Sequence, residues 1–160
     1  MTKEASKKAS FARRDLLKAA GLGALALAGG TLASTQAMAT PEEVGMLIDE
    51  ITKNKKPTEG KINLDVPEIA ENAATVRTTI TVDSPMTADN HVKAIHVFGE
   101  GNPAPNIVSF NLGPSIPQAK VTTRIRLAQS QNVVAVAVMS DGSSFIAKKE
   151  VKVTIGGCGK

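Results

Sequence analysis

The stretch Val133-Val134-Ala135-Val136-Ala137-Val138-Met139 is an almost continuous apolar run of valines, alanines and one methionine. A short apolar run rich in β-branched residues is typical of a strand that is covered on both faces. We therefore predict a central strand here. Asp141-Gly142 follows it and predicts a tight hairpin turn, after which a last strand is expected over residues 145–155.

The neighbouring segments alternate between apolar and polar residues. Residues 75–82 place Val76, Thr78, Ile80 and Val82 on one face, opposite Arg77, Thr79 and Thr81. Residues 120–127 place Val121, Thr123, Ile125 and Leu127 opposite Thr122, Arg124 and Arg126. Further strands are predicted over 61–66, 91–98 and 107–112, separated by turns rich in Gly, Pro and Asn. About seven short strands with no helix between them predict an all-β fold, an immunoglobulin-like antiparallel β-sandwich.

A short helix is expected ahead of the strands, over residues 41–53. Thr40 and Glu43 have the spacing of a capping box, and Pro41 suits the first helical position. The apolar residues that follow recur at helical spacing and form one stripe, which should lie against the rest of the domain or against a partner. This stripe consists of Val44, Leu47, Ile48 and Ile51.

Residues 1–39 have the composition of an export signal. A basic, polar opening containing Arg13-Arg14 precedes an Ala, Leu and Gly stretch, and Ala37-Met38-Ala39 forms a small-x-small cleavage site. The paired arginines predict a twin-arginine signal peptide and a mature chain that begins at Thr40. A general secretory signal and an uncleaved anchor are the alternatives. The apolar stretch is short and Gly-rich for a membrane span, so we expect a periplasmic protein with no membrane attachment after cleavage.

The charge of the chain is concentrated in this signal. Six of the 19 basic residues and two of the 15 acidic residues lie within 1–39, which leaves 13 of each in the mature chain. The formal net charge of +4 is therefore lost with the signal. Without a basic excess, Trp or Tyr, the mature chain lacks the usual features of a nucleic-acid-binding protein.

The mature chain divides into a helix and β-sandwich domain, 40–155, and a flexible arm, 156–160. Cys158 is the only cysteine, and Gly156, Gly157 and Gly159 surround it. Five extended residues reach roughly 17 Å, enough to carry a thiol into a pocket of another protein. An unpaired cysteine in an oxidising compartment indicates a reactive thiol or an intermolecular disulfide.

Other candidate sites carry weaker signals. His91 and His96 are an odd number of residues apart in one expected strand and should point to opposite faces, which disfavours a shared metal site. Asp89 and His91 are expected on one face of that strand, but no nucleophile accompanies them. We therefore predict no catalytic residue, no metal and no cofactor.

The segment Val153-Thr154-Ile155-Gly156-Gly157-Cys158-Gly159 resembles the carboxyl terminus of the SoxY family, the sulfur-carrier subunit of the periplasmic thiosulfate-oxidising system. The export signal, the opening helix and the segment 67–72 ahead of a strand fit the same family. Members usually end in Gly-Gly-Cys-Gly-Gly, so Lys160 departs from the pattern.

The resemblance implies a carrier without catalytic activity of its own. In that family a c-type cytochrome of the SoxAX type joins the arm cysteine oxidatively to thiosulfate, giving a cysteine S-thiosulfonate. A manganese-dependent thiosulfohydrolase of the SoxB type then releases sulfate. The resemblance also implies a heterodimer with a small SoxZ-type subunit that lacks a signal peptide, and it assigns sulfur attachment to Cys158.

Two alternatives to the carrier function remain. The first is an exported β-sandwich interaction module whose Cys158 forms an intermolecular disulfide, possible also between subunits. The second is an exported thiol enzyme, which would need a general base near the thiol. The sequence offers no specific candidate for that base.

Overall fold

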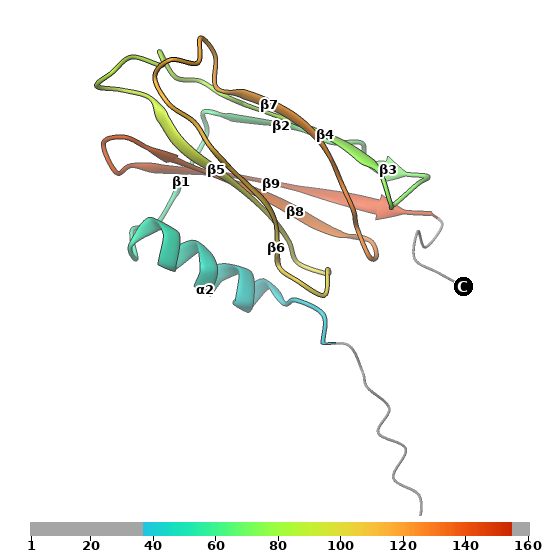
Figure 1. The fold of residues 1–160 in the computed structure, drawn as a ribbon. Helices are drawn as coiled ribbons and strands as arrows, with labels where there is room; N and C mark the ends of the chain where they lie inside the picture. The colour runs from blue at the N-terminus through green and yellow to red at the C-terminus, as the bar shows by residue number, and fades with distance from the viewer. Residues whose placement is uncertain (1–36, 155–160) are drawn as a thin grey trace, which may run out of the picture. The chain divides into compact units, whose positions relative to one another are not determined.

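The computed structural model describes residues 37–154, so most of the expected signal peptide and the tail 155–160 lie outside the described residues. Helix α2 (Pro41–Thr52) comes first and the strands follow it (Figure 1). The strands are β1 (Thr58–Glu59), β2 (Ile62–Asp65), β3 (Ile69–Ala70), β4 (Val76–Val82), β5 (Val92–Gly99), β6 (Asn106–Asn111), β7 (Lys120–Ile125), β8 (Gln131–Met139) and β9 (Ser144–Val153).

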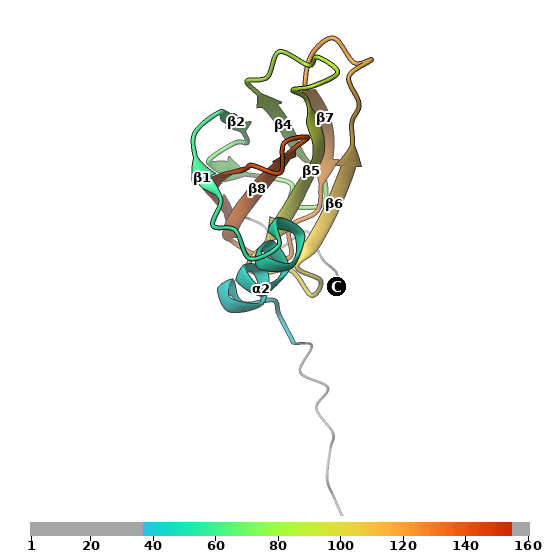
Figure 2. The same ribbon diagram turned by 90° about the vertical axis from the view of Figure 1, so that its left-hand side faces the viewer.

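The strands form two sheets that pack face to face. The larger sheet has the order β1-β9-β8-β5-β6, with β3 also paired to β9, and the smaller sheet has the order β2-β4-β7. Helix α2 covers the outer face of the larger sheet, which gives three layers (Figures 1 and 2). The predicted all-β sandwich with one short opening helix is confirmed.

Strand β8 is the central strand that its composition predicts. It pairs antiparallel with β5 on one side and with β9 on the other. Val133, Ala135 and Ala137 belong to the core between the sheets, and Val134 and Val136 belong to a second core under α2. Both faces of the strand are thus covered, which is why it carries almost no polar side chain.

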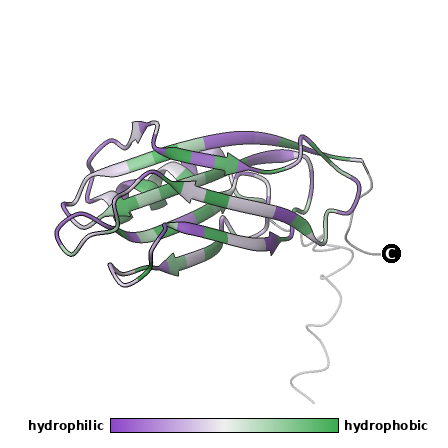
Figure 3. Ribbon diagram, turned by 90° about the horizontal axis from the view of Figure 1, so that it is seen from above, coloured by the Kyte–Doolittle hydropathy of each residue, from purple (hydrophilic) through white to green (hydrophobic). Residues whose placement is uncertain are grey.

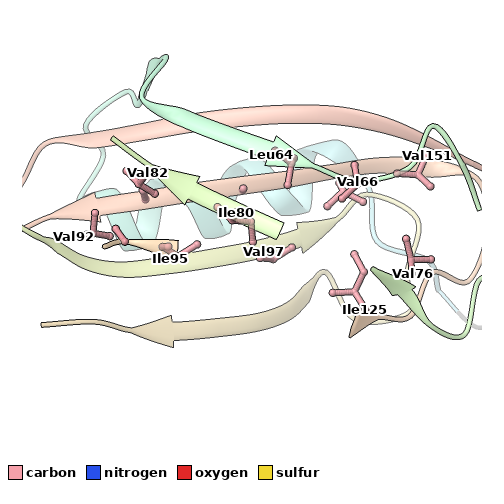
Figure 4. Close-up of a cluster of buried hydrophobic side chains, with 14 of the residues drawn as sticks. Leu64, Val66, Val76, Ile80, Val82, Val92, Ile95, Val97, Ile125 and Val151 are labelled. Carbon is pink, nitrogen blue, oxygen red and sulfur yellow. The ribbon is translucent and has the colours of Figure 1, made fainter. Parts of the chain in front are cut away.

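The core between the sheets is built mainly from aliphatic side chains. Ile80 of β4, Ile95 and Val97 of β5 and Val151 of β9 are fully buried there (Figure 4). The predicted alternation of β4 is confirmed, because its even-numbered residues from Val76 to Val82 are buried while Arg77 is exposed. Figure 3 shows this alternation as hydrophobic and hydrophilic residues succeeding one another along the strands.

Helix α2 has the predicted cap and the predicted buried stripe. The Glu43 backbone N–H donates to the Thr40 hydroxyl at 3.3 Å, and the Thr40 N–H donates to the Glu43 carboxylate at 3.2 Å, which completes the capping box. Val44 and Ile48 are buried against the larger sheet, whereas Met46 is 65% exposed. The helix ends at Lys53, whose φ of 56° is left-handed.

Two very short strands were not predicted from the sequence. Strands β1 and β3 both pair with β9, and both pairs are parallel. The main ladders of each sheet are antiparallel, as expected. Strand β9 is therefore paired along one side with β8 and at both ends of its other side with these short strands.

Candidate functional site

The end of β9 is where the described chain leads to the expected cysteine arm. Val151 is fully buried and Val153 is half-buried against the core. Successive backbone N–H groups donate to opposite sides: Lys152 to the Glu68 carbonyl at 2.8 Å, Val153 to the Ser130 hydroxyl at 2.9 Å. Thr154 N–H donates to the Ala70 carbonyl at 3.3 Å. The backbone is therefore held on both sides up to the last described residue.

The residues predicted to carry the chemistry lie beyond this point. Cys158, Gly156, Gly157 and Gly159 fall outside the described residues, so their predicted roles stay predictions. Their starting point is nevertheless defined, because Cys158 follows Thr154 by four residues. An extended chain of that length spans about 14 Å.

A buried polar cluster lies next to the end of β9. The Asn102 amide donates to the Arg126 carbonyl at 2.9 Å, and its side-chain oxygen accepts from Ala128 N–H at 2.9 Å. The same oxygen accepts from the Gln131 amide at 2.8 Å. Gln131 in turn accepts from Gly101 N–H at 2.8 Å. These amides join the loop after β5 to the segment leading into β8, close to Ser130.

A groove opens beside this cluster, between edge strand β6 of the larger sheet and edge strand β7 of the smaller one. Its volume is about 760 Å³. Asn102 and Ile107 line one side, Ile125 and Arg124 line the other, and Ala128 lines the end toward Ser130. Met38 also lines it. Sequence reasoning missed this groove because its two walls are brought together only by closure of the sandwich.

The outer face of the smaller sheet is basic. Arg77 of β4 lies directly opposite Arg124 of β7 in the antiparallel register, and both side chains are exposed. Lys120 lies on the same face two pairs along, opposite Thr81. Within residues 37–154, neither Arg77 nor Arg124 forms an ion pair with a carboxylate. Like charges directly opposite each other repel, so this pair favours a bound anion.

The two histidines lie in separate environments. His96 of β5 stacks on Phe98 under α2, with ring centroids 6.3 Å apart, and its Nδ1 lies 2.8 Å from the Ser109 hydroxyl. Partial burial lowers the pKa of His96 below its ordinary value. His91 precedes β5, and its Nδ1 lies 3.1 Å from the Thr87 carbonyl oxygen.

No metal-binding group of three or more His, Cys, Asp or Glu side chains occurs among the described residues. The expectation that Asp89 and His91 share a strand face is wrong, because β5 begins only at Val92. Asp89 instead lies in the preceding loop, where its carbonyl accepts from the Ser140 hydroxyl at 3.0 Å. In the part of the chain that the structure describes, no helix is long and apolar enough to cross a bilayer.

Comparison with solved structures finds the same sandwich in two groups of proteins. The sulfur carrier protein SoxY from Chlorobium limicola f thiosulfatophilum superposes with a TM-score of 0.59 at 29% identity, covering 70% of this chain and 92% of that chain. The superoxide reductase (neelaredoxin) from Ignicoccus hospitalis gives a TM-score of 0.52 at 21% identity, covering 72% of this chain and 94% of the other.

A superoxide reductase from Nanoarchaeum equitans gives a TM-score of 0.51 at 14% identity, covering 61% of this chain and all of its own. The likeness to the two reductases concerns the fold alone. No curated protein matches the chain.

The family comparison covers most of the sequence. The model of the family described as sulfur oxidation protein SoxY matches residues 48–158, from the second half of α2 through the whole sandwich to the cysteine. The resemblance noted at the carboxyl terminus is thereby extended to the domain that carries it. The chain belongs to the SoxY family of sulfur oxidation proteins.

Proposed function

We propose that this protein is a covalent sulfur carrier of thiosulfate oxidation, with Cys158 as the attachment point. The observation that carries the proposal is the end of β9, where three hydrogen bonds hold the backbone four residues before the only cysteine of the chain. The family match, which ends at Cys158, supports the same assignment. A rigid root followed by Gly156 and Gly157 suits a group that is presented to several enzymes in turn.

The proposed loading step forms one S–S bond. The Cys158 thiol loses its proton, the thiolate sulfur bonds to the outer sulfur of thiosulfate, and two electrons pass to a c-type cytochrome of the SoxAX type. The product is a cysteine S-thiosulfonate. Water then cleaves the terminal S–S bond in a SoxB-type thiosulfohydrolase, releasing sulfate and two protons and leaving a persulfide on Cys158. Both reactions belong to the partner enzymes, and the carrier itself catalyses neither.

The proposal includes the setting in which these steps occur. The signal at 1–39 would take the chain to the periplasm by the twin-arginine pathway, which exports folded proteins. A SoxZ-type subunit without a signal of its own would then travel with it as a heterodimer. Covalent attachment to Cys158 would keep reactive sulfur from diffusing away between enzymes.

Intact-mass spectrometry of the mature protein from cells grown on thiosulfate tests the proposal. The expected result is a series of reductant-labile thiosulfonate and polysulfur additions that map to the tail peptide and disappear in Cys158→Ser. Ser143→Ala serves as a matched control, because this exposed loop hydroxyl lies at the β8–β9 turn, far from the tail.

A different outcome would favour the second candidate, an interaction module. If Cys158 were found only as a free thiol or in a disulfide to another protein, the carrier proposal would fail. The protein across that disulfide would then be the partner to identify.

A further inference from the structure

We propose that the groove between β6 and β7 is a docking site for the chain's own tail, residues 155–160, and that it holds the anionic adduct on Cys158 next to Arg124. The inference deepens the proposed function and rests on it for the identity of the adduct. It adds a resting position for the loaded tail between visits to partner enzymes.

The tail starts close enough to the groove to reach it. Ser130 holds the backbone of Val153 at 2.9 Å, and Ala128, two residues before Ser130, lines the groove. Two residues span about 7 Å, whereas the four residues from Thr154 to Cys158 span about 14 Å when extended. The groove therefore lies within the length of chain that follows the last described residue.

The lining of the groove suits this occupant. Ile107 and Ile125 provide an apolar wall against which a glycine-rich backbone can pack closely. Asn102 adds a polar group at one end. Arg124 provides the cation, and a planar guanidinium is well matched to the oxygens of a sulfonate.

The electrostatic environment of Arg124 favours an anion. Arg124 lies directly opposite Arg77, and no carboxylate among residues 37–154 forms an ion pair with either. A sulfonate beside Arg124 would offset the repulsion within this pair. The unloaded thiol lacks that charge, so the loaded tail should dock more tightly than the empty one.

Residues expected to leave with the signal peptide occupy part of this region. Met38 lines the groove, and Ala39 is 5% exposed with its N–H donating to the Asn102 carbonyl at 2.8 Å. Cleavage after Ala39 would remove both residues. The groove would then become free for the tail in the mature protein.

Disulfide pairing in the mature protein tests the docking. Because Cys158 is the only native cysteine, one added cysteine gives a single possible intramolecular bond. Ala104→Cys places it in the groove, and Glu71→Cys places it beside Ala70, on the opposite side of the tail's starting point. Glu59→Cys lies at the far end of β9, beside Ile146.

At low protein concentration with a mild oxidant, we expect the groove cysteine to pair with Cys158 several-fold faster than the cysteine at 71. The cysteine at 59 should not pair within the molecule, because the length of β9 separates it from the tail. Equal rates at 104 and 71 would mean that the tail has no preference for the groove and would overturn the proposal.

A second measurement tests the role of the charge. Tetrathionate converts a thiol to the S-thiosulfonate and releases thiosulfate, so Cys158 can be loaded without partner enzymes. We expect dithiothreitol to remove the adduct several-fold faster from Arg124→Gln than from the native chain. Arg77→Gln is the matched control, since Arg77 lies on the same face but does not line the groove.

Equal acceleration by both arginine variants, or no acceleration by either, would contradict docking at Arg124. Neither measurement depends on loading in the cell. A failure of the proposed function, seen as the absence of adducts in protein from thiosulfate-grown cells, is therefore distinguishable from a failure of the docking site.

Discussion

Replacing Asn102 by alanine should destabilise the domain more than its size suggests. The Asn102 side chain joins three segments through hydrogen bonds to the Arg126 carbonyl, the Ala128 N–H and the Gln131 amide. Asn102 is 9% exposed and Gln131 is 7% exposed, so water cannot readily replace the lost partner. Asn102→Ala would leave these groups without it while the surrounding backbone stays in place.

The magnitude follows from the groups that are orphaned. Each buried polar group without a partner costs about 1–3 kcal/mol. Gln131 keeps a bond to the Gln129 carbonyl at 3.2 Å, so the main losses are at Ala128 N–H and the Arg126 carbonyl. We expect a total of about 3 kcal/mol. For a folded region of this size, that corresponds to a fall in Tm of about 12 °C.

Urea and thermal unfolding, followed by circular dichroism, measure this loss. Asn63→Ala is the matched control, because Asn63 is an exposed asparagine of β2 on the outer face of the smaller sheet. It should change the free energy of unfolding by no more than about 0.5 kcal/mol. A loss below about 1 kcal/mol in Asn102→Ala, or equal losses in the two variants, would refute the reasoning.

Two further predictions concern the face of the larger sheet that α2 covers. Val44→Ala should lower the free energy of unfolding by about 2 kcal/mol, because Val44 is 1% exposed under the helix, whereas Met46→Ala, at a position 65% exposed, should have almost no effect in the same urea titration. The lowered pKa of His96 means that the folded state disfavours the imidazolium, so the protein should lose stability as pH falls from 6.5 through the folded-state pKa. Unfolding measured between pH 7 and 5 checks this, and His96→Gln should flatten the profile.

The sequence predicted those parts of the fold that have a strong local signal. The valines of β8 indicated a strand covered on both faces, and Thr40 with Glu43 indicated the start of α2. Both patterns act through neighbouring residues, so a single sequence reveals them. The position of Cys158 was equally plain, since it needs no tertiary information.

The remaining features depend on contacts between distant segments. Strands β1 and β3 have two residues each, and they form only because β9 offers a free edge to pair with. The buried amides Asn102 and Gln131 have no periodic signature in the sequence. The groove likewise requires Ile107 and Ile125, which come from different sheets, to face each other.

The arrangement of β9 has a consequence for protein synthesis. This strand is the last to leave the ribosome, yet it pairs with β8, β1 and β3 and places Val151 in the core. A chain that ends a dozen residues early lacks both the cysteine and much of this strand. Such a product exposes the apolar edge of β8 and is a substrate for proteases. Folding thus acts as quality control: a chain stable enough to survive has been translated almost to its final residue.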